Sequence, residues 1–484
     1  MRKPSMTAPH IPVLRQGRVH QSLDTQTVNK LGTDDPAAII SFAPADMIKY
    51  DLLRMSEARE ALKKFSSADL VEITKKAGEY FLEADLPVGT DGALQSPEDY
   101  VLSLAATSGL PHALIRMNMK RLGGIFGDIE TIFRGLTRGL DWSVLDQGYG
   151  EQGGAPVSFS ATTNELAVIL PSNSPAVNAL WIPAIAMKVP VLLKPGREEP
   201  WTPYRIIQAF IKAGAPAEAF SLYPTQHDGS GAIIRRAGRV MLFGDDSTVK
   251  QYENDERVEV HGTGYSKFII GEDEIDNWEN YVDTIVESVS ANSGRSCICT
   301  STIIVPRHGD EIAHAVSKRL SEIRPLAQDD PDAKLSGFAN PQFAEWINDA
   351  VEQGLESDGA RDITAEYRDG ERFQTRDGMN YLQPTIVRVD SFGEDLALRE
   401  FLFPFASVIE CPQSEMIEHM GYSLVATAVT RDVAWMNQLF DCPDIERLNI
   451  GNVPTNRISW DQPHEGNLFE FLYTRRSFQI AEIA

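Results

Sequence analysis

Apolar side chains recur three and four residues apart from Met47 onward, and Phe65 closes the first such run. This spacing places them on one face of a helix. Ser67 then stands in the position of a helix cap before a second run that starts at Leu70. The pattern predicts an all-helical opening that continues to about residue 140. The first 45 residues show little periodicity, and we expect them to form an extended N-terminal arm.

After the helical opening the pattern changes to alternation. Residues 148–160 begin with several glycines and continue like a strand, so a β-hairpin is predicted there. Two continuously apolar runs, Leu166–Leu170 and Val189–Leu193, are then separated by a helix-length stretch, Asn178–Met187. Short apolar runs on either side of a helix are typical of buried parallel strands in a βαβ unit.

The same style continues toward the middle of the chain. Thr202 can cap a helix over Pro203–Ala213 that ends at Gly214. Two further apolar runs, Arg239–Phe243 and Phe268–Ile270, are predicted as a third and a fourth strand. Alternating strands and helices predict a doubly wound α/β domain.

A second α/β domain is predicted because the alternation of apolar strands and helices repeats. A helix is expected over 275–292, followed by a glycine-bearing turn, a strand over Thr300–Val305 and a helix over 309–323. Residues 353–378 are charged and weakly periodic, so we expect a surface excursion there.

Composition and net charge limit the classes of molecule that the chain can bind. The chain has 484 residues, of which 42% are hydrophobic, and its 45 basic and 69 acidic residues give a formal net charge of −24. This negative balance repels nucleic acid and anionic lipid, and no apolar run approaches the ~20 residues of a membrane-spanning helix. We therefore expect a cytoplasmic protein, with no nucleic acid partner and no membrane insertion.

Four cysteines are few for this length and favour free thiols. Cys297 and Cys299 are too close to bridge comfortably, and no histidine or cysteine pair lies nearby at zinc-ligand spacing, so no metal is expected. Gly229 and Gly231 lack the final glycine of a dinucleotide fingerprint, and no P-loop ending occurs. Neither a simple Rossmann dehydrogenase nor a nucleoside triphosphatase is predicted.

Cys297 lies in a glycine-containing turn, Asn292–Ser301, that joins a helix to a strand. A nucleophilic thiol needs access and nearby donors or positive charge, and this loop offers backbone N–H groups and Arg295. Cys297 is therefore the candidate nucleophile. The alternative is that Cys297 and Cys299 are two small buried residues.

A run of short motifs follows one order along roughly residues 160–480. The motifs are Pro171–Pro175, Leu193–Pro195, Lys212–Pro216, Leu242–Gly244, Gly294–Cys297, Asn380–Thr385, Arg399–Pro404 and Tyr422–Val429. In this order and at these separations they resemble the aldehyde dehydrogenase superfamily, whose members use a cysteine thiolate and a nicotinamide cofactor.

The resemblance implies a role for each matching residue. Cys297 would be the nucleophile and Asn173 the oxyanion-hole side chain. Lys194 would meet the adenosine ribose, Gly244 would lie beside the pyrophosphate, and Glu400 would hold the nicotinamide ribose. The implied cofactor is NAD or NADP. Asn173 as a turn residue and Lys194 as a surface charge are the alternatives.

One departure concerns the step that releases the product. Hydrolytic members place a general-base glutamate where this chain has His261, and Glu259 would need a shifted alignment. The arrangement His261-Gly-Thr-Gly264 is more similar to the CoA-acylating branch, which includes the fatty acyl-CoA reductases of bacterial bioluminescence. CoA is then the implied co-substrate. A structural histidine that caps the glycine turn is the alternative for His261.

Two further departures concern the cofactor. Arg197 replaces an acidic residue that many members set against the adenosine ribose, so a 2′-phosphate is not repelled and NADP is permitted. Asp245, just after Gly244, adds negative charge where a pyrophosphate would lie. Either the loop turns Asp245 away or the cofactor is bound differently.

The predicted fold class is α/β and aldehyde dehydrogenase-like, with two doubly wound domains, a helical N-terminal region and a small β oligomerisation arm. We expect an arm over 1–45, a helical opening plus dinucleotide-binding domain over 46–265 and a cysteine domain over 266–445. Residues 446–484 form a C-terminal return segment, and the oligomerisation strands lie within 141–162.

The predicted activity is the NAD(P)-dependent interconversion of an acyl-CoA and an aldehyde through a thioester on Cys297. A hydrolytic aldehyde dehydrogenase giving a carboxylic acid is the first alternative, and a catalytically silent structural or binding relative is the second. We expect a small-molecule aldehyde or acyl-CoA as substrate and a homo-oligomer, dimer or tetramer. Substrate-pocket residues are expected over Leu114–Phe133 and Asn452–Trp460.

Overall fold

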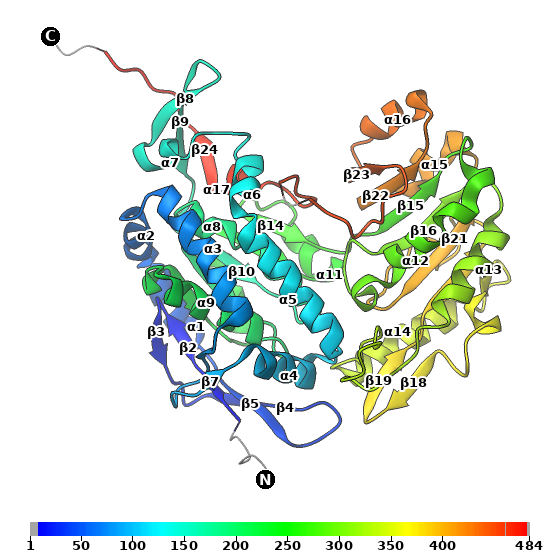
Figure 1. Cartoon of the computed structure of the whole chain (residues 1–484), viewed down its shortest axis with the longest axis horizontal. Helices are drawn as coiled ribbons and strands as arrows, with labels where there is room; N and C mark the ends of the chain where they lie inside the picture. Colours follow the sequence, from blue (N-terminus) through cyan, green and yellow to red (C-terminus); the bar gives the residue numbers. More distant parts are fainter. Residues whose placement is uncertain (1–7, 460, 482–484) are drawn as a thin grey trace. The chain divides into compact units, whose positions relative to one another are not determined.

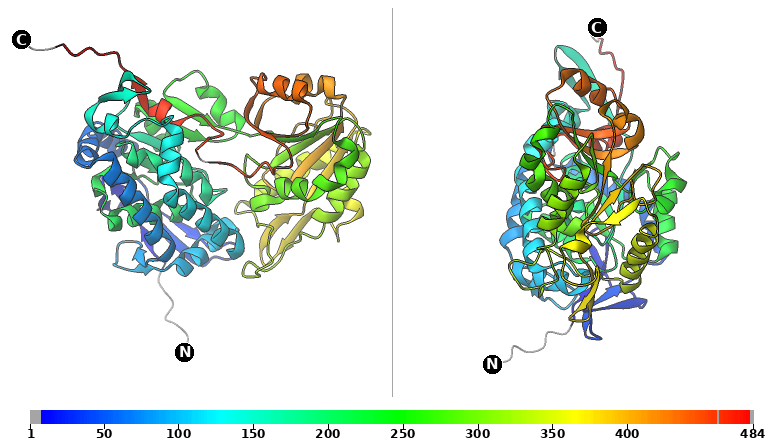
Figure 2. Two further views of the ribbon diagram at one scale, coloured as in Figure 1. Left: turned by 45° about the horizontal axis from the view of Figure 1, so that its top comes forward. Right: turned by 90° about the vertical axis from the view of Figure 1, so that its right-hand side faces the viewer.

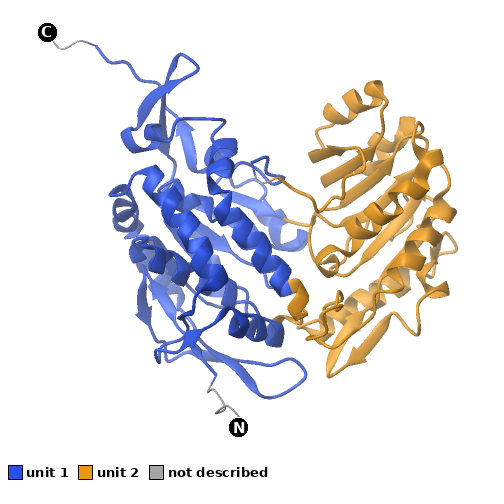
Figure 3. Cartoon of the chain, in the orientation of Figure 1, with its two compact units in different colours: residues 1–107, 115–261, 460–484 blue, residues 108–114, 262–459 orange. Residues whose placement is uncertain are grey.

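The computed structural model describes residues 8–459 and 461–481. The chain divides into two compact units (Figure 3). Unit 1 contains residues 1–107, 115–261 and 460–484, and unit 2 contains residues 108–114 and 262–459.

The N-terminal segment is folded into sheets, whereas the sequence predicted an extended arm. Its strands are β1 (His10–Ile11), β2 (Val13–Arg15), β3 (Arg18–His20), β4 (Thr25–Asn29) and β5 (Pro36–Ser41). β1, β5 and β4 form one sheet, and β2 pairs antiparallel with β12. These strands are too short for a clear periodic signal, but the burial of Ile11, Val13 and Leu14 gives them a packed face. The first seven residues of the predicted arm lie outside the described residues.

The predicted helical opening is confirmed. It contains α1 (Ala45–Leu52), α2 (Met55–Lys63), α3 (Ser67–Glu83), α4 (Pro97–Ser108), α5 (His112–Gly127), α6 (Ile129–Leu136) and α7 (Ser143–Gln147). A small hairpin, β6 (Leu86–Pro87) and β7 (Leu94–Gln95), interrupts it. The cap of α3 is Ser66 instead of Ser67, because Ser66 and Asp69 form a reciprocal capping box.

Unit 1 is built on a seven-stranded sheet of order β14-β13-β10-β11-β12-β2-β3. Its later strands are β10 (Leu166–Ile169), β11 (Val191–Lys194), β12 (Phe220–Leu222), β13 (Arg239–Phe243) and β14 (Val258–His261). The neighbours from β14 to β12 pair in parallel, as the βαβ pattern predicted. Phe268–Ile270, predicted as the fourth strand, lies in unit 2, and β14 is the strand that follows β13 in this sheet.

The connections of unit 1 contain 3-10 helix η1 (Pro175–Leu180), α8 (Pro183–Ala186), α9 (Trp201–Ala213), α10 (His227–Arg236) and α11 (Asp246–Val249). The helix predicted over 178–187 is a 3-10 turn followed by a short helix, because proline cannot donate to a continuing helix. The predicted end of the next helix is confirmed, with Gly214 at φ 103° as the C-cap of α9, but the predicted start is wrong, because α9 begins at Trp201 and Thr202 lies inside it.

Unit 2 is built on a second seven-stranded sheet, of order β17-β20-β21-β16-β15-β22-β23 (Figure 1). The strands are β15 (Ser266–Ile270), β16 (Thr300–Val305), β17 (Ala360–Asp362), β20 (Thr385–Val389), β21 (Phe405–Glu410), β22 (Ser423–Val429) and β23 (Ile445–Ile450). The predicted surface excursion contains β17 and one strand of a hairpin, β18 (Phe373–Arg376) and β19 (Met379–Leu382).

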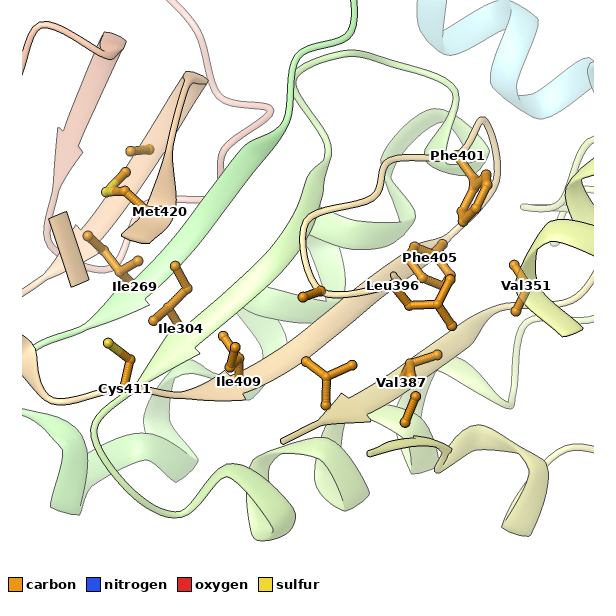
Figure 4. Packing of buried hydrophobic residues seen from close by; sticks show 14 of the residues in the cluster. Ile269, Ile304, Val351, Val387, Leu396, Phe401, Phe405, Ile409, Cys411 and Met420 are labelled. Atoms are coloured by element: carbon orange, nitrogen blue, oxygen red, sulfur yellow. The ribbon is translucent and has the colours of Figure 1, made fainter. Parts of the chain in front are cut away.

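Helices cover both faces of the unit 2 sheet. Alternate strand residues go to opposite cores, so Ile269 and Ile304 pack on one face while Phe268 and Ile303 pack on the other. The first core (Figure 4) includes α14 (Pro341–Gly354), α15 (Gln413–Met420) and α16 (Val433–Phe440). The second includes α12 (Val282–Ser290) and α13 (Gly309–Leu320). This arrangement is doubly wound, as predicted.

The predicted β-hairpin forms a small sheet with the C-terminal segment. β8 (Tyr149–Gln152) pairs with β9 (Ala155–Ala161), and β9 pairs with β24 (Tyr473–Arg475), which follows α17 (Leu468–Leu472). Figure 1 and Figure 2 show these strands side by side in unit 1. Across the described chain, we find no helix with the length and apolar character needed to cross a membrane. All four cysteines are free.

Candidate active site

Four parallel strands of unit 1 end at the same edge of its sheet. β14, β13, β10 and β11 are neighbours in that order, so the loops after them are adjacent. These loops carry predicted site residues: Asn173 after β10, Lys194 at the end of β11, Gly244 after β13 and His261 at the end of β14. Open α/β sheets bind ligands outside this carboxyl edge.

Asn173 is half-buried on the loop directly after β10. The next residue, Ser174, caps η1 by accepting from the backbone N–H of Ala176 at 3.3 Å. The loop is therefore fixed at one end by the strand and at the other by the cap. An amide side chain on such a loop can be presented to a ligand with little loss of freedom.

Lys194 and Arg197 lie on the loop after β11. Burial lowers the pKa of Lys194, an effect that Glu198 opposes and Arg197 reinforces. Arg197 is exposed, and its guanidinium lies 2.7 Å from Oε1 of Glu198. The other oxygen of Glu198 accepts from the Ser172 hydroxyl at 2.8 Å, which joins the loops after β10 and β11. Sequence reasoning missed Glu198. Its carboxylate offsets the positive charge of Arg197, which the sequence analysis considered for pairing with a 2′-phosphate.

Asp245 is turned into a helix cap. Its carboxylate accepts from the backbone N–H of Thr248 at 2.9 Å and from the Ser247 hydroxyl at 2.8 Å, and these hydrogen bonds lower its pKa. Gly244 donates its N–H to the carbonyl of His261 at 3.2 Å, which joins the ends of β13 and β14. Of the two alternatives for Asp245, the first matches this geometry.

His261 is enclosed by two carboxylates. Its Nδ1 lies 2.7 Å from Glu465 and its Nε2 lies 3.2 Å from Glu259, and its side chain is 2% exposed. The ring stacks on Phe243 with the centroids 4.5 Å apart. Burial alone would lower the pKa of His261, but the two carboxylates outweigh it and raise the pKa to about 10. The two carboxylates therefore favour the protonated form of the His261 ring.

Glu259 and Glu465 also line a pocket of unit 1 of about 380 Å³, its open mouth included. The apolar walls come from α5, α6, η1, β13 and the C-terminal segment, and they include Ile125, Ile132, Leu136, Leu180, Met241 and Leu468. Of the two stretches predicted to line a substrate pocket, 114–133 contributes to it. From the C-terminal segment the lining takes residues 463–468 instead of 452–459, and Trp460 lies outside the described residues.

In unit 2 the turn before Cys297 has three consecutive left-handed residues. Asn292, Ser293 and Gly294 have φ values of 49°, 62° and 65°. A Cβ on Gly294 would lie 2.4 Å from the backbone of Phe403, so only glycine fits there. The predicted nucleophile turn is therefore packed directly on a later motif, and its strained backbone is held by tertiary contact.

Cys297 itself is half-buried, and its carbonyl is held by the first residue of β15 and the segment just before it. The Ser266 hydroxyl donates to this carbonyl at 2.7 Å. Gly264 approaches so closely that a Cβ there would lie 1.9 Å from the same oxygen. In contrast, Cys299 is buried and its thiol donates to the carbonyl of Ala291 at 3.3 Å. Cys297 is the more accessible thiol of the pair.

Glu400 contacts the same segment. One carboxylate oxygen accepts from the backbone N–H of Tyr265 at 2.6 Å, and the other accepts from that of Gly264 at 3.4 Å. In unit 2 Glu400 is therefore a backbone anchor, and the ribose contact that the resemblance implies stays a prediction.

Arg295 anchors the other side of the nucleophile turn. Its guanidinium donates to the carbonyls of Gly337 at 2.5 Å and Ser108 at 3.3 Å, and it lies 4.9 Å from the ring centroid of Phe338. Burial lowers its pKa to about 10. The positive charge noted in the sequence thus holds loop backbone in place.

The residue that sequence reasoning missed most completely is Glu465. It lies 204 positions from His261 along the chain, and no local pattern joins the two. Glu259 did carry a signal, because residues two apart on a strand point to the same face. The two carboxylates beside His261 therefore come from one residue near it in the sequence and one far from it.

This doubly wound fold, with an accessible cysteine in a strained turn and polar loops at a carboxyl edge, defines a cysteine-bearing α/β protein of the aldehyde dehydrogenase fold. The model of the aldehyde dehydrogenase family matches residues 151–469, so the chain belongs to this family. The resemblance found in the sequence is confirmed at that level.

The chain is similar to individual relatives and solved structures. It is 24% identical over 309 residues to succinate semialdehyde dehydrogenase of Acinetobacter baylyi, which covers 60% of this chain and 61% of that protein. The aldehyde dehydrogenase KauB from Pseudomonas aeruginosa superposes with a TM-score of 0.80 at 17% identity, covering 97% and 96% of the two chains. An indole-3-acetaldehyde dehydrogenase solved with NAD+ gives 0.78 at 18% identity, covering 98% and 97%.

Proposed function

We propose that this chain is an NAD(P)-dependent aldehyde dehydrogenase that releases a carboxylic acid. Family membership supports the aldehyde and the cofactor. The observation that carries the acid product is the carboxylate pair around His261, because Glu259 and Glu465 stand within ion-pair distance of the base position. The relative from Acinetobacter baylyi is named a succinate semialdehyde dehydrogenase, which supports the same direction.

The residues at the carboxyl edge of unit 1 fit a dinucleotide. Lys194 ends β11 and Gly244 follows β13, on either side of β10, and the Asp245 carboxylate is occupied by hydrogen bonds from Thr248 and Ser247. Lys194 would bind the adenosine ribose, Gly244 would border the pyrophosphate, and Glu400 would bind the nicotinamide ribose. When bound, NAD(P)+ accepts the hydride that leaves the substrate.

The protein's own residues would act in two stages. The Cys297 thiolate attacks the aldehyde carbon, and the Asn173 amide with the Cys297 N–H stabilises the oxyanion. After oxidation the acyl group is a thioester on Cys297, and a base must take a proton from water. Glu259 is the base that we propose, held in place by the His261 imidazolium, which Glu465 holds in turn.

The experiment that tests this proposal follows NAD(P)H formation from an aldehyde with and without CoA, in water enriched in ¹⁸O. A sustained CoA-free rate with one ¹⁸O in the acid is the expected result. Glu259→Gln should then slow deacylation at least about tenfold, since removal of a general base typically costs 10²–10⁴-fold. Cys297→Ala is the control for any background reaction.

A second candidate is the acyl-CoA reaction predicted from the sequence. The observation in its favour is that a histidine, and no glutamate, occupies the end of β14. A CoA thiolate attacks a thioester without strong base help, and in reverse Cys297 would attack an acyl-CoA and the thioester would be reduced to the aldehyde. A rate that requires CoA, with acyl-CoA as the product, would replace the hydrolytic proposal.

We also infer that the small sheet of unit 1 takes part in a homo-oligomer. β8 and β24 are its edge strands, and edge strands present unpaired N–H and C=O groups to a partner strand. Mass measurement in solution tests this inference. Deletion of residues 149–156 should lower the mass from that of a dimer or tetramer to that of the monomer.

A further inference from the structure

Lys267 is a buried lysine of unit 2 that neither the family motifs nor the proposed reaction uses. It lies on β15, one residue after Ser266, and it is 1% exposed. Moving an ammonium out of water is costly unless the protein supplies acceptors. The contacts of Lys267 therefore show what holds it in place.

The Lys267 ammonium joins the beginnings of two neighbouring strands. Its Nζ donates to the carbonyl of Tyr265, just before β15, and to that of Tyr422, just before β22, both at 2.6 Å. β15 and β22 pair in parallel, with Lys267 opposite Ala426. Burial lowers the pKa of Lys267 to about 7, and the nearby Glu400 opposes that shift.

Tyr265 is held in a conformation that it would not adopt by preference. Its φ is 47°, in the left-handed region, which is unfavourable for a residue that carries a side chain. It is held from both sides, because Glu400 accepts from its N–H and Lys267 donates to its carbonyl. Strain of this kind persists where the surroundings fix the backbone more than once.

The residues on either side of Tyr265 meet the nucleophile. Gly264 lies against the carbonyl oxygen of Cys297, and the Ser266 hydroxyl donates to the same oxygen at 2.7 Å. Ser266 is itself fixed by the backbone N–H of Val425 at 3.3 Å. The backbone of Cys297 therefore rests on a three-residue segment whose middle residue is clamped by Lys267 and Glu400.

We propose that Lys267 is a positioning residue, which through Tyr265 holds the Gly264–Ser266 segment against Cys297 and so sets the direction of its thiol. The proposal rests on the role of Cys297 in the proposed function. Lys267 acts on the nucleophile through the backbone and touches neither substrate nor cofactor.

Lys267→Met tests the proposal, because methionine has nearly the same length and shape but no donor. We expect kcat to fall at least about tenfold, since a displacement of ~1 Å can cost ~100-fold, while the aldehyde KM changes less than about threefold. The matched control is Lys188→Met, which removes the ion pair of another buried lysine, with Asp146 in unit 1. That variant should keep kcat within about twofold of wild type, because its ion-pair partner is Asp146 and no step of the proposed reaction uses it.

A second readout does not depend on turnover. Iodoacetamide labelling followed by mass spectrometry should show slower alkylation of Cys297 in Lys267→Met, because the thiol loses its fixed orientation. Cys442, a half-buried thiol elsewhere in unit 2, serves as the internal reference and should keep its rate. This readout still applies if the wild type shows no aldehyde oxidation, so failure of the proposed function is distinguishable from failure of the clamp.

Ser266→Ala tests the same geometry if Lys267→Met fails to fold. It removes one hydroxyl and, with it, the hydrogen bond to the Cys297 carbonyl. The smaller alanine side chain is accommodated without steric conflict. We expect the same signature at a smaller size, a kcat loss of about threefold, as one neutral hydrogen bond implies. The proposal would be overturned if folded Lys267→Met kept both the kcat and the Cys297 labelling rate of the wild type. If Lys267→Met does not fold, the same result in Ser266→Ala would overturn it.

Discussion

The nucleophile region of unit 2 and the carboxyl edge of unit 1 are built in different ways. Around Cys297 the backbone is fixed by close contacts and left-handed residues, so that Gly264 and Gly294 leave no room for a methyl group. At the carboxyl edge, side chains such as Arg197 and Glu198 are set mainly by pairing of charges. Geometry that depends on backbone contact is disturbed by one methyl group, whereas paired charges on a loop can adjust. A substitution at Gly264 or Gly294 should therefore cost more than one at Arg197 or Glu198.

The largest effect should come from Cys297→Ala. It removes the sulfur that forms the thioester, so we expect turnover to fall by at least about 10³-fold, as for other nucleophiles acting with their partners. The fold and cofactor binding should stay, because one half-buried side chain changes. Steady-state rates, thermal melting and cofactor titration measure these. Cys299→Ala is the control, and a comparable loss there with activity kept in Cys297→Ala would reassign the nucleophile.

Gly264→Ala should come next. A Cβ at this position would lie 1.9 Å from the Cys297 carbonyl oxygen, so the segment must move. We expect kcat to fall about 100-fold and the free energy of unfolding to fall by about 1–3 kcal/mol, as for overpacking. The control is Gly124→Ala on α5, where nothing lies within 4 Å and alanine should stabilise the helix by about 0.5–1 kcal/mol. Equal kinetics in both variants would refute the backbone argument.

Lys194→Ala probes the carboxyl edge and should affect the cofactor alone. We expect the KM for NAD(P) to rise about tenfold, because one charge-assisted hydrogen bond is lost. Acylation of Cys297 at saturating cofactor should keep its rate. Lys212→Ala, an exposed lysine in the last turn of α9, is the control and should change neither. Equal slowing of acylation at saturating cofactor would show that Lys194 does more than bind the cofactor.

His261→Gln should change how stability depends on pH. The folded pKa of His261, about 10, lies above its ordinary value of 6.5. The stability it contributes is therefore complete below pH 6.5 and is lost as the pH rises through about 10. Urea unfolding from pH 6 to 10 should show the wild type losing its advantage over His261→Gln with rising pH. A constant difference would mean that His261 is neutral in the folded protein, and it could then serve as a base.

The fold was largely predictable because its buried strands are continuous apolar runs. Thr300–Val305 and Arg239–Phe243 have the predicted bounds, since few other structures bury such runs on both faces. The strands of the N-terminal segment were not predicted. They have only two to six residues, and β2 pairs with the distant β12, so local periodicity carries little information about them.

The candidate site was predictable only where its chemistry is local. Cys297 stood out because a glycine turn and a thiol occur together in the sequence. The surroundings of His261 could not be predicted, because Glu465 reaches it from the far end of the chain. Lys267 had no signal either, since its partners are two backbone carbonyls, which any residue supplies.

The smallest expected effect concerns Arg197 and the choice between NAD and NADP. Because Glu198 lies 2.7 Å from the guanidinium, little positive charge is available for a 2′-phosphate. Arg197→Glu should weaken NADP relative to NAD by only about threefold, since an exposed ion pair contributes about 0.2–1 kcal/mol. Glu198→Gln should shift the preference the other way, toward NADP, because it frees the guanidinium. The ratio of kcat/KM for the two cofactors measures both variants. If the NADP/NAD preference is unchanged in both variants, Arg197 and Glu198 lie away from the ribose. If Arg197→Glu changes the preference tenfold or more, Glu198 does not offset the guanidinium when cofactor is bound.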